Sequence, residues 1–338
     1  MVTAGHAWTE AGAFPVAEGV HRIPLPLPND GLRAVNVYVL ETADGLVAVD
    51  GGWALPGARA LLARALATLG AGLGDLRRFL VTHVHRDHYT QAVAVRRETG
   101  ARVGLGVGER PSLEVLRSAD RSPQSEQVAA LRASGAAGLA DRLEVAISDS
   151  KVDLADWEPP DEWLTAGDYP LPGGRVLEAV ETPGHTSGHL VFHDLAARLL
   201  FAGDHVLPTI TPSIGFQAAL AEQPLADFLR SLALVRTRPD ALLLPAHGPV
   251  AASVHARVDE LIAHHGRRLD EAEAAAAGSG TAADVAAALR WTRRQLRWAE
   301  LDDFNAMLAV LETGAHLDLL TAQGRLTVQV HAGVKQYG

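Results

Sequence analysis

Residues 81–91, VTHVHRDHYTQ, place three histidines and one aspartate within six positions, directly after an apolar run. Imidazole and carboxylate groups suit a borderline divalent ion such as Zn²⁺, and a loop can turn several of them toward one point. The chain contains no cysteine, so any metal must be held by histidine, aspartate and glutamate. The stretch therefore predicts at least half of a metal site. Its candidate ligands are His83, His85, Asp87 and His88.

Three later stretches add one candidate ligand each, again at the end of an apolar run. They are TPGHTSGH with His185, FAGDH with Asp204 and LPAHGP with His247, which brings the set to seven. Seven ligands suit two adjacent ions, with three ligands for each ion and one shared carboxylate. Two such ions, about 3.5–4 Å apart, lower the pKa of a bridging water and stabilise the oxyanion formed when it attacks a carbonyl or phosphoryl group.

In this order, THVHRDH, TPGHTSGH, FAGDHV and PAHGP resemble the successive motifs of the metallo-β-lactamase-fold hydrolases, and VAVDGG with Asp50 is similar to the first motif. The resemblance runs from about residue 35 to 250. It implies an α/β (α+β) fold, an αββα sandwich of two mixed sheets with the metals at one edge. It also implies ligand roles: His83, His85 and His185 for the first metal, Asp87, His88 and His247 for the second, Asp204 as the bridge, and Asp50 as a residue that orients a ligand.

Asp204 at the bridging position and the tail HLDLLTAQGRLTV look like the glyoxalase II-like and winged-helix-bearing members. This resemblance implies a dinuclear hydrolase in which a metal-bridging hydroxide attacks an ester-like carbonyl, a thioester or a lactone of a small molecule. Asp87 would also accept a proton from the water, so Asp87 and Asp204 are the predicted catalytic residues. Zn²⁺ is the expected ion, although Fe and Mn²⁺ accept the same ligands. The basic glutathione-binding residues of true glyoxalase II have no match here, which argues against glutathione thioesters.

The order of patterns predicts how these residues are positioned. Strands are expected at 21–27, 34–42 and 45–52, a helix at 55–72, and a buried strand at 76–83 that leads into the histidine cluster. We predict a catalytic domain over residues 1–255 and a helical, winged-helix-like domain over 256–338. We interpret residues 109–168 as an acidic helical insertion that forms a lid. This segment contains thirteen acidic and six basic residues, so its net charge of −7 is most of the chain's net charge of −10.

Several polar residues are candidates for other roles around the metals. DHYTQ departs from many relatives, which carry a small residue and glycine after Asp-His, so Tyr89 is expected at the mouth of the site. Thr209, Thr211 and Ser213 in PTITPSIGF are expected in the substrate pocket, although turn chemistry explains them equally well. His189, His193 and His205 are expected to support ligands, face a strand or lie at the surface. His264 and His265 are expected on a solvated helix surface.

Composition limits the partners. A net charge of −10, with two lysines among 30 basic residues, argues against nucleic acid and favours a small-molecule substrate. Apolar stretches are too interrupted for membrane spans, and the N-terminus lacks the pattern of a signal peptide, so we expect a cytoplasmic protein without a membrane partner. A homodimer remains open. The alternative function is an RNA or DNA phosphodiesterase of the same superfamily, favoured if Arg290, Arg293, Arg294 and Arg297 form one exposed stripe facing the metals.

Overall fold

The computed structural model describes residues 7–28, 31–118, 122, 124–148, 154–278 and 280–338. Within these residues the first β-sheet has seven strands in sequence order, antiparallel from β1 to β4 and parallel from β4 to β7. The strands are β1 (Phe14–Ala17), β2 (Val20–Pro26), β3 (Ala34–Thr42), β4 (Gly45–Val49), β5 (Leu76–Val81), β6 (Arg102–Gly106) and β7 (Glu162–Leu164). The expected opening meander and the buried strand before the histidines are confirmed.

The second sheet contains five described strands in the order β12-β11-β10-β9-β8. Its neighbours are antiparallel except for the parallel pair β11 and β12. The strands are β8 (Gly167–Pro170), β9 (Val176–Glu181), β10 (Leu190–Asp194), β11 (Leu199–Gly203) and β12 (Leu242–Pro245). Both sheets are therefore mixed, as expected.

The two sheets pack face to face, and each also buries its outer face. In β3, Tyr38 and Leu40 point into the cluster between the sheets, whereas Val37 and Val39 point into the cluster beneath the outer helices. Successive side chains of a strand point to opposite faces, so a strand buried on both sides is apolar at nearly every position. This explains why the strands appear in the sequence as continuous apolar runs without polar alternation.

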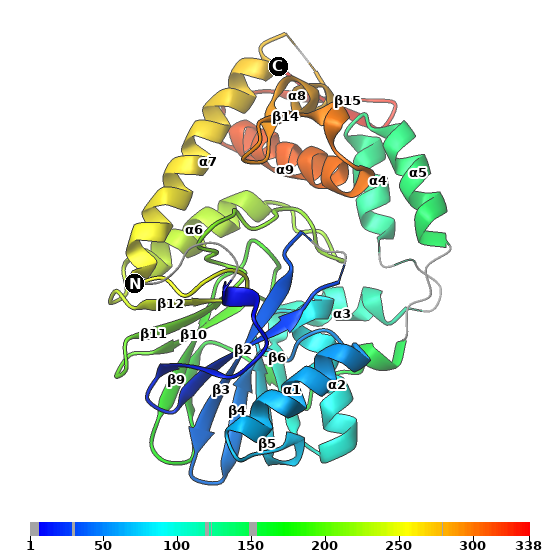
Figure 1. The fold of residues 1–338 in the computed structure, drawn as a ribbon. Helices are drawn as coiled ribbons and strands as arrows, with labels where there is room; N and C mark the ends of the chain where they lie inside the picture. Colours follow the sequence, from blue (N-terminus) through cyan, green and yellow to red (C-terminus); the bar gives the residue numbers. More distant parts are fainter. Residues whose placement is uncertain (1–6, 29–30, 119–121, 123, 149–153, 279) are drawn as a thin grey trace.

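Helices cover both outer faces (Figure 1). On the first sheet lie α1 (Pro56–Thr68) and α2 (Arg86–Thr99), and on the second lie α6 (Pro224–Arg236) and α7 (Val254–Ala276). A proline begins α1, where its missing N–H has no helical partner to lose, and left-handed Gly100, at φ 78°, ends α2. The αββα sandwich implied by the resemblance is confirmed.

The remaining helices gather at one end of the sandwich, at the top of Figure 1. They are α4 (Ser125–Ala133), α5 (Ala137–Ser148), α8 (Ala282–Ala288) and α9 (Asp303–Ala322), while α3 (Arg110–Leu116) stays beside the first sheet. Val128 and Leu131 of α4 share one buried cluster with Met307 and Val310 of α9. The segment 109–168 thus packs on the C-terminal helices. The prediction of a helical insertion is wrong for the end of this segment, because Glu162–Leu164 and Gly167–Pro170 are strands of the two sheets.

Two short hairpins complete the C-terminal part. They are β13 (Arg290–Trp291) with β14 (Leu296–Arg297), and β15 (Val328–His331) with β16 (Val334–Tyr337). Helices followed by a terminal hairpin agree with the element types expected there, while the winged-helix assignment and the boundary at residue 255 stay predictions. Among the helices of the described residues, none has the length and hydropathy needed to span a membrane.

Candidate metal centre

All seven predicted ligands follow the C-terminal ends of strands. His83, His85, Asp87 and His88 lie in the connection after β5 and in the first turn of α2, with His85 as the residue that precedes the helix. His185 follows β9, Asp204 follows β11 and His247 follows β12. Because β4, β5 and β6 are parallel, and β11 and β12 are parallel, these strand ends meet at one edge of the sandwich. The structure brings the seven together there.

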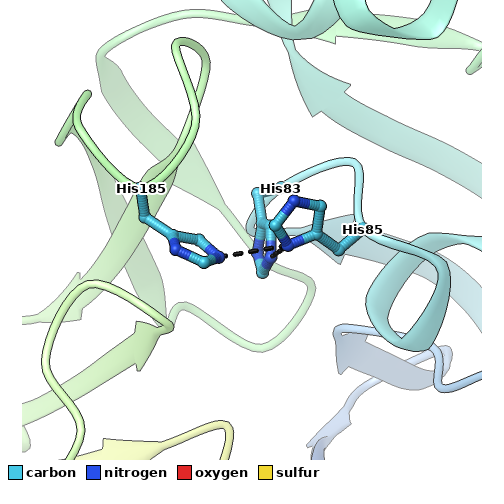
Figure 2. Close-up of side chains that lie close together, drawn as sticks. All are labelled: His83, His85 and His185. Atoms are coloured by element: carbon cyan, nitrogen blue, oxygen red, sulfur yellow. Dashed lines mark hydrogen bonds between the residues drawn. The ribbon is translucent and has the colours of Figure 1, made fainter. Parts of the chain in front are cut away.

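Three histidines form the first group. His85 Nδ1 lies 3.0 Å from His83 Nε2 and 3.1 Å from His185 Nε2. Figure 2 shows the three rings pointing toward a common point, with His185 arriving from the opposite side to His83 and His85. His83 and His185 are buried, and His85 is partly exposed. The three nitrogens are as close together as the ligands of one ion.

Hydrogen bonds on the far side of each ring fix which nitrogen carries the proton. His85 Nε2 lies 3.2 Å from the carbonyl of Phe216, and His185 Nδ1 lies 2.8 Å from the carbonyl of Ser213. A carbonyl only accepts, so each of these nitrogens donates and the inward nitrogen keeps a bare lone pair. His83 Nδ1 likewise donates to Thr82 Oγ1, whose own proton goes to Asp50. Three converging lone pairs repel one another without a cation between them. This arrangement fits a divalent metal.

The second group contains His88, His247 and Asp87. His247 donates from Nδ1 to the carbonyl of Ala34 at 2.8 Å, which leaves its Nε2 facing inward, 3.4 Å from Asp87 Oδ2. His88 Nε2 lies 3.7 Å from the same oxygen. Both Nε2 atoms are buried and have no hydrogen-bond partner in the described parts of the chain. Buried polar atoms normally have a hydrogen-bond partner, so these two unpaired nitrogens indicate that something binds between them.

Asp204 lies between the two groups. Its Oδ2 is 3.5 Å from His185 Nε2, and its Oδ1 is 3.3 Å from His247 Nε2. Oδ1 is buried without a hydrogen bond to any described residue. One carboxylate oxygen thus faces each group, which is the placement that a bridging ligand requires.

The charges of the site also favour cations. Burial lowers the pKa of His88, but the carboxylates of Asp50, Asp87 and Asp204 outweigh it and raise that pKa to about 10. In the first group, burial followed by the charge of His185 lowers the pKa of His85 to about 3, so His85 is neutral and ready to donate a lone pair. The second group therefore attracts positive charge, and a metal competes there with protons.

Asp50 has the predicted position behind the ligands. Its Oδ2 accepts from His88 Nδ1 at 2.9 Å, and its Oδ1 accepts from the backbone N–H and the hydroxyl of Thr82 at 2.8 and 2.9 Å. Thr82 Oγ1 lies 3.1 Å from His83 Nδ1, so Asp50 orients ligands of both groups. Sequence reasoning missed Thr82, which the motif THVHRDH contains.

His189 supports the bridging residue. Its Nε2 accepts the backbone N–H of Asp204 at 3.1 Å, and its Nδ1 lies 2.9 Å from the hydroxyl of Thr182. Gly203, at φ 50°, makes this approach possible, since a Cβ there would lie 2.7 Å from both His189 Nε2 and Thr82 Oγ1. His193 and His205 are also buried. None of the three lies at the surface.

The prediction for Tyr89 is wrong. Tyr89 is fully buried in the first turns of α2, its ring stacks on Trp157, and its hydroxyl donates to the carbonyl of Glu158. A helical repeat places successive residues about 100° apart, so the neighbour of inward-facing His88 turns toward the outer core. Tyr89 therefore packs beneath the helix and does not line a mouth.

The loop that follows Asp204 lies against the first group, as expected for PTITPSIGF. Ser213 contacts the site through its carbonyl, which accepts from His185. Thr209 and Thr211 are partly exposed, and their role in a pocket stays a prediction. Phe216 was missed: its ring lies 5.8 Å from that of His85 and packs edge-on, at 5.6 Å, against Phe304 of α9. Phe304 is 51% exposed, so an apolar surface adjoins the metals.

The expectation that His264 and His265 lie on a solvated surface is wrong for His265. Its relative exposure is 0%, and its ring lies 5.5 Å from that of Phe228. Adjacent helix residues point in different directions, and α7 is covered on the side of His265 by α6 and α9. The two arginines that follow in the sequence, Arg267 and Arg268, had indicated a solvated surface instead.

Comparisons with known proteins agree with this geometry. A model of the metallo-beta-lactamase superfamily matches residues 30–247. Among curated relatives, a hydroxyacylglutathione hydrolase of Rhizobium etli is 36% identical over 80 residues, which cover 24% of this chain and 29% of that protein. The match thus spans less than a third of the relative's length.

Two solved structures are similar over nearly the whole chain. A beta-lactamase domain protein from Burkholderia ambifaria is 29% identical with a TM-score of 0.80, covering 96% of this chain and 94% of that one. A metallo-beta-lactamase family protein from Thermus thermophilus is 27% identical with a TM-score of 0.72, covering 96% and 99%. The C-terminal helices beyond residue 247 therefore have counterparts in other proteins of this fold.

Proposed function

This chain belongs to the metallo-beta-lactamase superfamily, and from its site we propose that it is a dinuclear metal-dependent hydrolase of small-molecule thioesters or lactones. The observation that carries the proposal is the position of Asp204, whose two oxygens face different groups of histidine nitrogens. Two divalent ions, with Zn²⁺ the best match to this ligand set, would activate a water as nucleophile and stabilise the oxyanion formed at the substrate carbonyl.

The residues of the chain have distinct tasks in this reaction. The five histidines hold fixed directions because backbone carbonyls, Thr82 or Asp50 anchor the far side of each ring. Asp87 is suited to accept the proton released by the nucleophilic water. Burial raises its pKa, but His88 and His247 outweigh burial and lower it, so the carboxyl is ionised.

The surface beside the metals supports an acyl substrate with an apolar part. Phe216 contacts the ring of His85, and the exposed ring of Phe304 extends that surface outward. Burial of an apolar chain against such rings stabilises a complex by roughly 25 cal/mol per Å². Similarity to a protein named hydroxyacylglutathione hydrolase supports a thioester, while the basic residues expected for glutathione have no match in this chain.

A phosphodiesterase is the second candidate. The exposure expected for it is present at Arg290, Arg293, Arg294 and Arg297 on the β13–β14 hairpin, while an orientation of these side chains toward the metals stays a prediction. Arg290 and Arg297 lie directly opposite each other, an arrangement that an anionic partner would stabilise. Against it stands the net charge of −10.

The test combines metal analysis with a panel of thioesters, lactones and phosphodiesters. We expect at least two equivalents of metal and turnover of a thioester or lactone, reduced more than about 100-fold in Asp204→Ala. Asp168→Ala, at an exposed strand position, is the matched control and should keep full activity. Protein without stoichiometric metal would refute the proposal, and turnover of phosphodiesters alone would establish the second candidate.

A further inference from the structure

A second set of metal-binding side chains lies outside the catalytic centre, between α7 and α9. His264 and His265 of α7 and Glu312 of α9 each offer a ligand atom, and these atoms all lie within 4.8 Å of one another. The three residues belong to none of the motifs that hold the catalytic ligands. They lie in the C-terminal part, after the last of those motifs at His247.

Hydrogen bonding leaves one nitrogen of His265 bare. His316 Nδ1 lies 2.7 Å from the carbonyl of Glu312, which only accepts, so Nδ1 carries the proton. In the neutral ring with its proton on Nδ1, the other nitrogen, Nε2, is an acceptor. His265 Nδ1 donates to that atom at 3.3 Å. The remaining nitrogen, His265 Nε2, is then an unprotonated acceptor.

This nitrogen has no partner in the described parts of the chain, although His265 is 0% exposed. A buried acceptor without a donor is destabilising, because it has lost its hydrogen bond to water. His265 Nδ1 is engaged by His316, so Nε2 is the nitrogen that remains for a ligand. A cation bound at Nε2 removes the penalty.

The neighbouring groups supply the rest of a coordination shell. His264 packs edge-to-face on His265 with ring centroids 5.2 Å apart. The carboxylate of Glu312 makes no hydrogen bond or ion pair with another described residue. Arg268 is the nearby positive charge. Its Nη1 lies 2.9 Å from Glu271 and its guanidinium lies 4.2 Å from the centre of the Trp291 ring, while its Nη2 is buried without a hydrogen bond to a described residue. Two imidazoles and a free carboxylate therefore remain for a metal.

We propose that His264, His265 and Glu312 form a separate mononuclear site for a divalent transition ion such as Zn²⁺, which ties α7 to α9. Two histidines and one glutamate are an established zinc ligand set that leaves one position open to water. Tetrahedral zinc with bonds of about 2.0–2.1 Å needs ligand atoms roughly 3.3 Å apart, so side-chain rotation must bring the three slightly closer. The catalytic group of Asp87, His88 and His247 has the same plan, with two adjacent helix residues and one distant ligand.

The site is independent of the proposed hydrolase activity but is linked to the catalytic domain by packing. The ring of His265 lies 5.5 Å from that of Phe228, which lies 5.1 Å from that of His205, the residue after Asp204. An ion at this position would fix the helices that cover the second sheet.

Metal counting tests the proposal on the full chain. The protein is stripped with a chelator and dialysed against Zn²⁺, and bound metal is measured by elemental analysis in wild type, His264→Ala, Glu312→Gln and His331→Ala. The first two variants should each bind one equivalent less than wild type, with kcat unchanged within about twofold. His331→Ala, at an exposed histidine of β15, should match wild type. The rise in Tm on adding Zn²⁺ should also be smaller in the first two variants.

Equal stoichiometry in all four proteins would overturn the proposal. Loss of more than one equivalent together with loss of activity would also overturn it, because the residues would then support the catalytic centre and not a separate ion. Glu312→Gln keeps the size of the side chain, so it decides the question if circular dichroism shows that His264→Ala is misfolded. Because only the difference from wild type is counted, failure here leaves the proposed hydrolase function untouched.

Discussion

Asp50→Asn tests how far the buried carboxylate behind the ligands controls metal affinity. Asp50 accepts from His88 Nδ1 at 2.9 Å and from Thr82 at 2.8 and 2.9 Å, and no described ligand of the first group touches it directly. Its backbone lies in the left-handed region at φ 62°, which asparagine adopts more readily than alanine. Asparagine therefore removes the charge and keeps the shape and the backbone, but it retains one of the two acceptor oxygens; with that oxygen toward His88, the bond to His88 becomes one to a neutral acceptor.

The size of the effect follows from the bond to His88. A hydrogen bond to a charged group contributes about 1.5–3 kcal/mol, and one between neutral groups about 0.5–1.5 kcal/mol. Neutralising Asp50 therefore weakens this support by about 1–1.5 kcal/mol, which corresponds to roughly a tenfold loss of affinity at the second group. Asp50 acts on the first group only through Thr82 and His83, so the metal affinity of the first group should fall less.

Competition with a chromogenic chelator measures the two affinities. We expect the Kd of one Zn²⁺, the ion of the second group, to rise about tenfold in Asp50→Asn, with a smaller change for the ion of the first group. Asp44→Asn, at an exposed position, is the control and should leave both unchanged. Unchanged affinities in Asp50→Asn, or an equal loss at both ions, would refute the reasoning that Asp50 acts through His88.

Three further substitutions test the surroundings of the site. Gly203→Ala places a Cβ 2.7 Å from Thr82 and His189 at φ 50°, so the metal stoichiometry and the Tm should both fall; unaltered values would contradict the tight approach. Phe304→Ala should raise KM for substrates with an apolar acyl chain by roughly 5- to 10-fold without changing kcat or Tm, and an unchanged KM would remove Phe304 from the substrate surface. Phe192→Ala, between the sheets, should lower the free energy of unfolding by about 3–5 kcal/mol in urea titration, and a loss below 1 kcal/mol would contradict its burial.

The sequence predicted the strands and the clustering of seven side chains because both depend on local order, whereas the αββα sandwich was implied by the resemblance of the motifs. Apolar runs mark strands, and a polar residue directly after a strand lies at the edge of the sheet. That rule applied to His83, His185, Asp204 and His247 without knowledge of which strands pair. Similarity in the order of motifs supplied the grouping of these residues, which residue spacing alone does not contain.

Predictions failed where the direction of a side chain depends on packing between distant segments. Tyr89 follows a ligand in sequence, yet the turn of α2 directs it toward Trp157, some 70 residues later. His265 is surrounded by charged residues in the sequence, but α6 and α9 cover its side of α7. Phe216 and Phe304 meet across 88 residues, and no local pattern marks that contact.

The supports behind the ligands imply that the metal centre and the fold form together. His247 is held by the carbonyl of Ala34, His185 by that of Ser213, and His85 by that of Phe216, so segments far apart in the sequence must be in place before the nitrogens converge. An unfolded chain offers no such arrangement, and metal affinity therefore contributes to folding free energy. At metal concentrations 100 times the Kd, each bound ion stabilises the native state by about 2.7 kcal/mol. Removal of the metal with a chelator should accordingly lower the Tm of the protein.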